Sequence, residues 1–92
     1  MKVYIVYGDS FGVDPNTNFT YSNLIMSHNY AVFYNREDAV KYIEMAWPNA
    51  KLGTDYVTRN FWIERIKYES RIKPGVYFTC ETYYGIDEKE LA

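Results

Sequence analysis

The chain has 92 residues, which is enough for one hydrophobic core, so we predict a single domain over residues 1–92. Its formal charge of −2 combines 10 basic with 12 acidic side chains, so the basic excess of nucleic-acid-binding proteins is absent and we expect no direct binding to nucleic acid. The single cysteine, Cys80, excludes an intramolecular disulfide and favours a reducing compartment.

The first predicted strand covers residues 2–7 (KVYIVY), where apolar side chains alternate on both faces. A strand that is apolar on both faces is typical of the centre of a sheet. The apolar run at residues 3–7 is too short for a signal peptide or a membrane span, so we expect a cytoplasmic protein with no membrane partner.

A Gly-, Asp- and Asn-rich loop is predicted at residues 8–18, followed by a second strand at residues 19–26 that runs antiparallel to the first. A polar turn is expected at residues 27–29. Residues 30–34 then form either a separate strand or a continuation of the second strand past a bulge.

A helix is predicted over residues 36–47. Asn35 is suited to the N-cap position, and Glu37 and Asp38 place negative charge in the first turn, where the helix dipole favours it. Pro48 ends the helix. The face expected to be apolar carries Ala39, Val40, Ile43, Ala46 and Trp47.

Residues 49–60 are polar and predict a loop, with a short extended piece at residues 56–57. The next strand is predicted at residues 61–69 (FWIERIKYE). Its apolar side chains change face midway, which indicates a bulge near residues 64–65.

The C-terminal part predicts a turn at residues 73–75, because Pro followed by Gly suits the two central positions of a type II turn. A last strand is expected at residues 76–84, and the acidic end at residues 85–92 as one frayed helical turn. The whole pattern predicts an α+β fold, in which the helix at residues 36–47 packs on one face of a four- to five-stranded antiparallel or mixed sheet.

The segments KVYIVYG, AVFYNREDAVKYIEMA and FWIERIKYE resemble a class of small phage and bacterial accessory proteins with the element order β-β-α-β. The resemblance covers residues 1–69, and the residues from Arg71 to the C-terminus lie outside it. It implies an accessory protein of a mobile genetic element, and it transfers no catalytic residue to this chain.

Few side chains in the sequence are suited to catalysis or metal binding. One histidine, His28, and one cysteine, Cys80, do not make a zinc site, and Cys80 in a predicted strand is expected to be a buried, inert thiol. The acids Asp9 and Asp14 lack the spacing of an EF-hand and are expected to bond the local backbone. We therefore predict no enzyme, no metal and no cofactor, and keep an enzyme assembled from scattered carboxylates, including Glu64 and Glu81, only as the third hypothesis.

Aromatic content is high, with 11 Tyr, 5 Phe and 2 Trp, and a sheet of this size with one helix cannot bury all of these rings. Because interface centres are enriched in Tyr, Trp and Phe, the leading hypothesis is a non-enzymatic binding protein. Together with the resemblance, this hypothesis predicts a phage or mobile-element inhibitor that occludes a host protein such as a defence nuclease. The predicted partner contacts are aromatic residues of the first loop and the strands, with acids near the end: Phe11, Tyr21, Tyr34, Tyr83, Tyr84, Asp87, Glu88 and Glu90.

The alternative hypothesis is a protein that sequesters a small ligand such as a nucleotide. It places the ligand in an aromatic pocket at the interface of a homodimer or larger homo-oligomer, where Arg59 or Arg65 meets an anionic group. Saturable thermal stabilisation by a small molecule distinguishes this alternative from protein binding.

Overall fold

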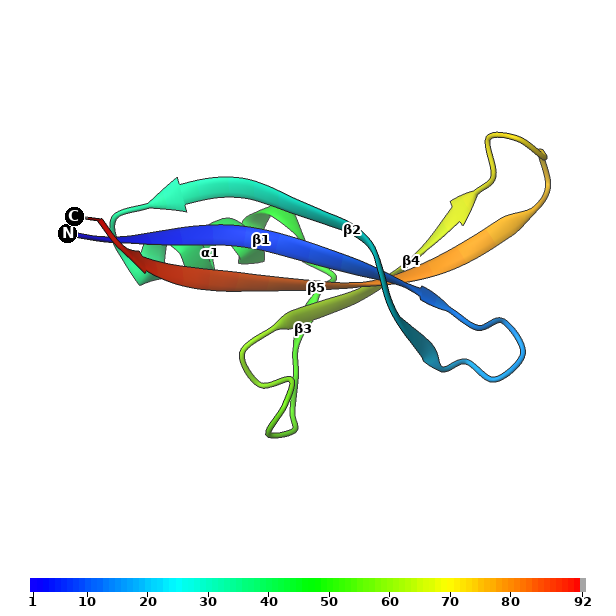
Figure 1. Cartoon of the computed structure of the whole chain (residues 1–92), viewed down its shortest axis with the longest axis horizontal. Helices are drawn as coiled ribbons and strands as arrows, with labels where there is room; N and C mark the ends of the chain where they lie inside the picture. Colours follow the sequence, from blue (N-terminus) through cyan, green and yellow to red (C-terminus); the bar gives the residue numbers. More distant parts are fainter. Residues whose placement is uncertain (92) are drawn as a thin grey trace.

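The computed structural model describes residues 1–91 and contains one five-stranded antiparallel sheet and one helix, which confirms the α+β class (Figure 1). The order of strands across the sheet is β2-β1-β5-β4-β3. The elements are β1 (Lys2–Val13), β2 (Thr20–Phe33), α1 (Arg36–Ala46), β3 (Lys51–Leu52), β4 (Trp62–Glu69) and β5 (Tyr77–Glu90).

Strand β1 lies between β2 and β5, as its two apolar faces predicted. It continues to Val13, so the prediction of a loop from residue 8 is wrong. Gly8 makes room for aromatic rings within the strand, because a Cβ there would lie 3.0 Å from Tyr30 and 3.1 Å from Tyr84. Glycine in this segment therefore marks close packing rather than a turn.

Strand β2 is continuous, and the alternative of one strand with a bulge is confirmed. Tyr7 pairs with Asn29 and Val6 pairs with Ala31, which leaves Tyr30 as the additional residue of a bulge. The prediction of a turn at residues 27–29 is wrong, because these residues pair with β1.

Helix α1 begins after Asn35, whose side-chain oxygen accepts a hydrogen bond from the Asp38 backbone N–H at 3.0 Å, as the N-cap prediction required. Ala39 and Ile43 of the helix are fully buried, whereas Ala46 is exposed, in contrast to its predicted place on the apolar face. The buried cluster joins helix and sheet through Val6, Ala39, Ile43, Trp62 and Tyr84.

Strand β4 pairs with β5 in regular register from Trp62 to Glu69, so the predicted bulge at residues 64–65 is wrong. The predicted turn is confirmed: Val76 donates its backbone N–H to the Lys73 carbonyl at 3.2 Å, and Gly75 has a positive φ of 86°.

The end of the chain is a strand rather than a helical turn. Residues 85–90 continue β5 alongside β1, so that Lys2 pairs with Glu90. The acidic side chains here meet positive groups: the N-terminal amine lies 3.0 Å from Glu90 and Lys2 lies 3.8 Å from Glu88. Between the helix and β4, the extended piece is β3 at Lys51–Leu52, and residues 56–57 lie in a turn instead.

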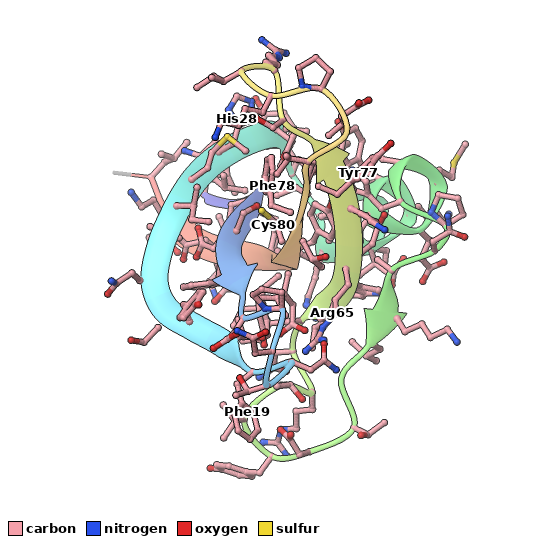
Figure 2. All side chains as sticks on the ribbon, turned by 90° about the vertical axis from the view of Figure 1, so that its right-hand side faces the viewer. Phe19, His28, Arg65, Tyr77, Phe78 and Cys80 are labelled. Carbon is pink, nitrogen blue, oxygen red and sulfur yellow. The ribbon has the colours of Figure 1, made fainter. Side chains whose placement is uncertain are left out.

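The molecule is elongated, with extents of 47 × 29 × 24 Å, and its radius of gyration of 14.9 Å exceeds the roughly 12 Å of a compact chain of this length. Helix α1 lies beside the half of the sheet that carries the chain ends, while the β1–β2 and β4–β5 hairpin tips extend away from it (Figure 1). Toward these tips the sheet curls, with Phe78 and Cys80 between β2 and β4 (Figure 2). Within residues 1–91 no helix has the length and apolar character needed to span a bilayer.

Candidate functional site

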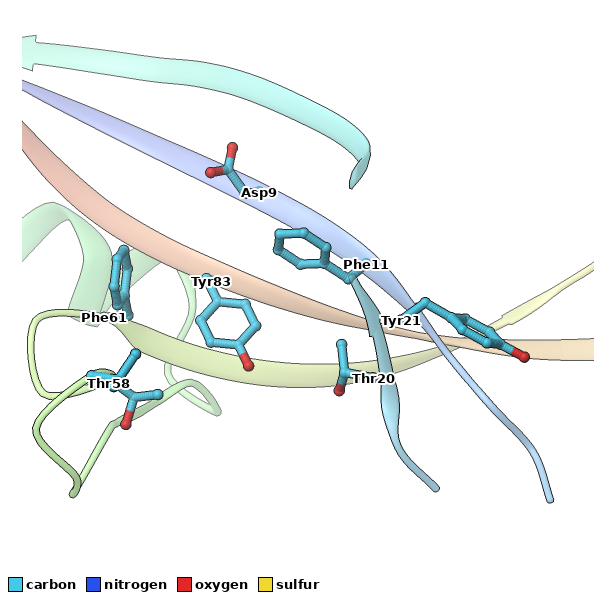
Figure 3. A pocket seen from close by; sticks show the side chains of 8 residues that line it. Asp9, Phe11, Thr20, Tyr21, Thr58, Phe61 and Tyr83 are labelled. Carbon is cyan, nitrogen blue, oxygen red and sulfur yellow. The ribbon is translucent and has the colours of Figure 1, made fainter. Parts of the chain in front are cut away.

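Four aromatic residues line a cleft of about 380 Å³ (Figure 3). Side chains alternate between the faces of a strand, so Phe11 and Tyr83 point to the face opposite Tyr84, which packs with the helix. The cleft therefore lies on the face of the sheet away from α1. It is lined by Asp9, Phe11, Thr20, Tyr21, Val57, Thr58, Phe61 and Tyr83.

Tyr83 forms the centre of the cleft and is held between two other rings. Phe11 meets it edge-to-face with ring centroids 5.7 Å apart, and Phe61 does the same at 5.9 Å. At the rim Val57 remains 77% exposed, and Tyr21 borders the cleft with its ring pointing away from Phe11 and Tyr83 (Figure 3). The cleft thus combines fixed rings with an apolar rim that is open to solvent.

The rim contributed by residues 53–61 is ordered by a network around Asp55. Its carboxylate accepts hydrogen bonds from the Thr58 backbone N–H at 2.7 Å and from the Thr58 hydroxyl at 2.8 Å. These bonds lower the pKa of Asp55. Gly53 is required where this loop closes, because a Cβ there would lie 2.3 Å from the Thr58 carbonyl oxygen. Val57 and Phe61 are thereby presented by a defined loop.

Below the cleft, the carboxylate of Glu81 joins three parts of the chain. It accepts hydrogen bonds from Arg65 Nε at 2.6 Å, from the Thr20 hydroxyl at 3.0 Å and from the Tyr83 hydroxyl. Arg65 also donates to the side chain of Asn18 at 2.6 Å and to its carbonyl at 3.2 Å. These hydrogen bonds connect the tip of the β1–β2 hairpin to β4 and β5.

The charges in this network are fixed at neutral pH. Burial raises the pKa of Glu81, but the hydrogen bonds from Tyr83, Arg65 and Thr20 outweigh burial, and the net pKa is lowered. Burial and the bond to Glu81 raise the pKa of Tyr83 to about 12. Glu81 is therefore a carboxylate and Tyr83 a neutral phenol, an arrangement suited to holding shape rather than to acid catalysis near neutral pH, which favours a carboxyl group with a raised pKa.

Three of the predicted partner contacts, Phe11, Tyr21 and Tyr83, line this one cleft. Tyr34 lines a separate cavity with Val3, Ile5 and Val32, among others. Tyr84 is only 3% exposed, with its ring stacked on Trp47 at 3.8 Å, so the prediction that it lies at the surface is wrong. The predicted acids Asp87, Glu88 and Glu90 lie on β5 where it pairs with residues 2–5 of β1, away from the cleft.

The two arginines of the alternative hypothesis are already engaged. All three guanidinium nitrogens of Arg65 donate to Glu81 or Asn18. The guanidinium of Arg59 lies 4.7 Å from the centre of the Tyr56 ring. Neither arginine lines the cleft.

The sequence did not single out Val57, Thr58 and Phe61 as site residues. An apolar Val57 within an otherwise polar loop is a weak signal, and only the long-range pairing of β1, β5 and β4 brings this loop opposite Phe11.

Other candidate residues have local roles. Cys80 is buried, and burial raises the pKa of its thiol. Asp14 accepts a hydrogen bond from the Asn16 backbone N–H at 2.8 Å, which confirms its predicted role in a turn. Asp9 lies within β1 and accepts a hydrogen bond from the Ser27 hydroxyl of β2 at 2.7 Å, so the prediction that it bonds the local backbone is wrong. In the part of the chain that the structure describes, no cluster of three or more His, Cys, Asp or Glu side chains is arranged to hold a metal ion.

Comparison with protein-family models, with curated protein sequences and with solved structures finds no match to this chain.

Proposed function

We propose that this protein is a non-enzymatic binding protein and that the aromatic cleft receives an apolar side chain of a protein partner. The observation that carries the proposal is the combination of fixed rings with an exposed rim. Phe11, Tyr83 and Phe61 are held against one another, so little conformational entropy is lost when a partner packs on them. Interface hot spots are pockets of this kind, in which an anchor residue becomes fully desolvated.

The network beneath the cleft supports the same role. The carboxylate of Glu81 is buried and paired with Arg65, so it presents no free charge to an apolar anchor. Arg65 holds Asn18 at the hairpin tip, which fixes the position of Thr20 relative to Tyr83. Preorganisation of this type raises affinity without additional contacts.

The partner we propose is a host protein whose working surface is occluded by this chain, such as a defence nuclease. The resemblance of residues 1–69 to phage and bacterial accessory proteins supports this choice. The predicted contacts Asp87, Glu88 and Glu90 lie at the opposite end of β5 from the hairpin tips, where the N-terminal amine, Lys2 and Lys89 balance their charge, so we assign the partner contact to the cleft alone.

The test is affinity capture from a bacterial lysate with immobilised protein, followed by quantitative mass spectrometry. We expect one dominant partner with the wild-type chain and its loss with Val57→Ser, which alters the exposed rim. Tyr34→Ser is the control, because Tyr34 is 75% exposed, close to the 77% of Val57, and lies outside the cleft. Capture that is equal for all three proteins contradicts the assignment of the cleft, and the absence of any captured protein contradicts the binding function.

A second candidate is a small apolar ligand, because a cavity of about 380 Å³ lies within the size range of ligand pockets, roughly 300–1,000 Å³. The engaged arginines favour an uncharged ligand over the nucleotide of the alternative hypothesis. Thermal shift against a panel of aromatic compounds separates the candidates, because saturable stabilisation that Val57→Ser abolishes supports a small ligand.

A further inference from the structure

The two edges of the sheet differ in charge. Strand β2 forms one edge along its whole length, and residues 15–35, which include all of it, contain no Asp, Glu, Lys or Arg. The strand contains no proline either. Lysine and proline are common means by which proteins prevent an exposed edge from pairing with another strand, and β2 has neither.

The opposite edge carries such protection. Strand β3 is only two residues long and covers β4 at Trp62 and Ile63. The remaining edge of β4 runs from Glu64 to Glu69 and contains alternating charges, with Arg65 and Lys67 between the two acids. The same sheet therefore has one charged edge and one uncharged edge, which is interrupted by the bulge at Tyr30 and is regular from Met26 to Asn29.

Strand β2 also exposes apolar side chains on both of its faces. In a continuous sheet these side chains would become cross-strand neighbours of a new strand, which is the arrangement that stabilises sheets. The exposed apolar side chains of β2 are Tyr21, Leu24, Ile25, Met26, Tyr30 and Val32.

The accessible surface of the chain is larger than a compact monomer requires. It measures 6952 Å², against roughly 5,600 Å² expected for 10.9 kDa, an excess of about 1,400 Å². A standard protein interface buries about 800 Å² per partner, and the excess is sufficient for one such interface.

We propose that two copies of this chain pair through β2, antiparallel and about a two-fold axis, to form one ten-stranded sheet. A two-fold interface brings each residue type against a copy of the same surface, so any charge in it would meet its like near the axis. An uncharged edge avoids this repulsion between like charges. It also provides no ion pair to a charged partner of another kind. The pairing is centred on Met26–Asn29, where β2 runs beside β1 without a bulge.

The first test is the mass of the protein in solution, measured by sedimentation equilibrium across the micromolar range. The wild-type chain is expected at twice 10.9 kDa. Ile25→Lys and Val32→Lys, at side chains that are 60% and 61% exposed, are expected at the monomer mass because a lysine on an edge strand prevents that strand from pairing with another. Ile72→Lys is the matched control, since Ile72 is 90% exposed in the β4–β5 turn, and this variant is expected to remain a dimer. Far-ultraviolet circular dichroism verifies that each variant is folded.

The second test distinguishes edge pairing from packing of sheet faces. Pairing through the edge protects the outward backbone N–H groups of β2, so alternate amides between residues 20 and 33 are expected to exchange slowly in the dimer and rapidly in Val32→Lys. A monomeric wild-type chain, a dimer that survives both β2 substitutions, or unprotected β2 amides in a dimer overturns the proposal. None of these results bears on the aromatic cleft, which is tested separately by Val57→Ser, because Val57 lines the cleft and lies outside β2.

Discussion

Replacing Glu81 by glutamine tests whether the carboxylate network holds the hairpin tip to the sheet. Glutamine keeps an oxygen that can accept hydrogen bonds from Thr20 and Tyr83, but it removes the charge that pairs with Arg65 at 2.6 Å. Hydrogen bonds to charged groups contribute about 1.5–3 kcal/mol to stability. The Arg65 side chain is 39% exposed, so water compensates part of the loss, and we expect Glu81→Gln to lower the free energy of unfolding by about 2 kcal/mol.

The pH dependence of this difference identifies its cause. The folded pKa of Glu81 lies below the ordinary value of 4.5, so the unfolded state binds the proton more tightly. The contribution of the carboxylate is therefore complete at a pH well above 4.5 and is lost as the pH falls through the folded pKa. Because Asp14 and Asp55 also have lowered pKa values, the difference between wild type and variant is needed to isolate Glu81.

The assay is urea denaturation followed by tryptophan fluorescence, at one protein concentration, from neutral pH to below the folded pKa of Glu81. We expect a constant difference near neutral pH that shrinks once the pH falls below 4.5. Glu44→Gln, at an exposed helix position, is the control and should change stability by less than about 0.5 kcal/mol. A Glu81→Gln variant as stable as wild type, or a difference that stays the same in acid, refutes the reasoning.

Three further predictions concern the core and the helix. Ile43→Ala removes a fully buried side chain of the helix, and should lower the free energy of unfolding by about 3 kcal/mol in urea denaturation; a loss of less than about 1 kcal/mol would mean that the helix does not pack as described. Asn35→Ala removes the helix cap and should cost about 1 kcal/mol by the same measurement, whereas Asn49→Ala, outside the helix, should cost little; equal effects would count against the cap. Glu64→Met removes a buried carboxylate oxygen, Oε2, that has no hydrogen-bond partner within the described residues. Because an unsatisfied buried oxygen costs stability, this variant should have a higher melting temperature than wild type. A lower melting temperature would indicate that the carboxylate makes a stabilising contact.

The sequence predicted the elements whose signals are local. The helix has a cap at Asn35 and a terminator at Pro48, and the turn before β5 has Pro74 and Gly75, so each can be identified within a few residues. The sequence failed where the signal depends on distant residues. Gly8 was interpreted as part of a loop, although it makes room for the rings of Tyr30 and Tyr84.

The predictions for the candidate site also divide into those that local signals support and those that depend on distant residues. Aromatic content identified Phe11, Tyr21 and Tyr83 as contacts, and all three line the cleft. Tyr84 was grouped with Tyr83 because it is adjacent, but neighbouring residues of a strand point to opposite faces, so one ring lines the cleft and the other is in the core. Which ring takes which face depends on the register between β1 and β5, and a single sequence does not specify that register.

The measurement that tests the proposed function most directly is the affinity of the purified, captured partner for Val57→Ser, determined by titration calorimetry beside the wild-type chain and Tyr34→Ser. Val57→Ser removes apolar surface from the rim of the cleft, and truncation of a hot-spot residue costs about 1.4 kcal/mol or more, so binding should weaken about tenfold or more. Tyr34→Ser should bind as wild type. Unchanged affinity for Val57→Ser, or an equal loss for both variants, would contradict a binding role for the cleft.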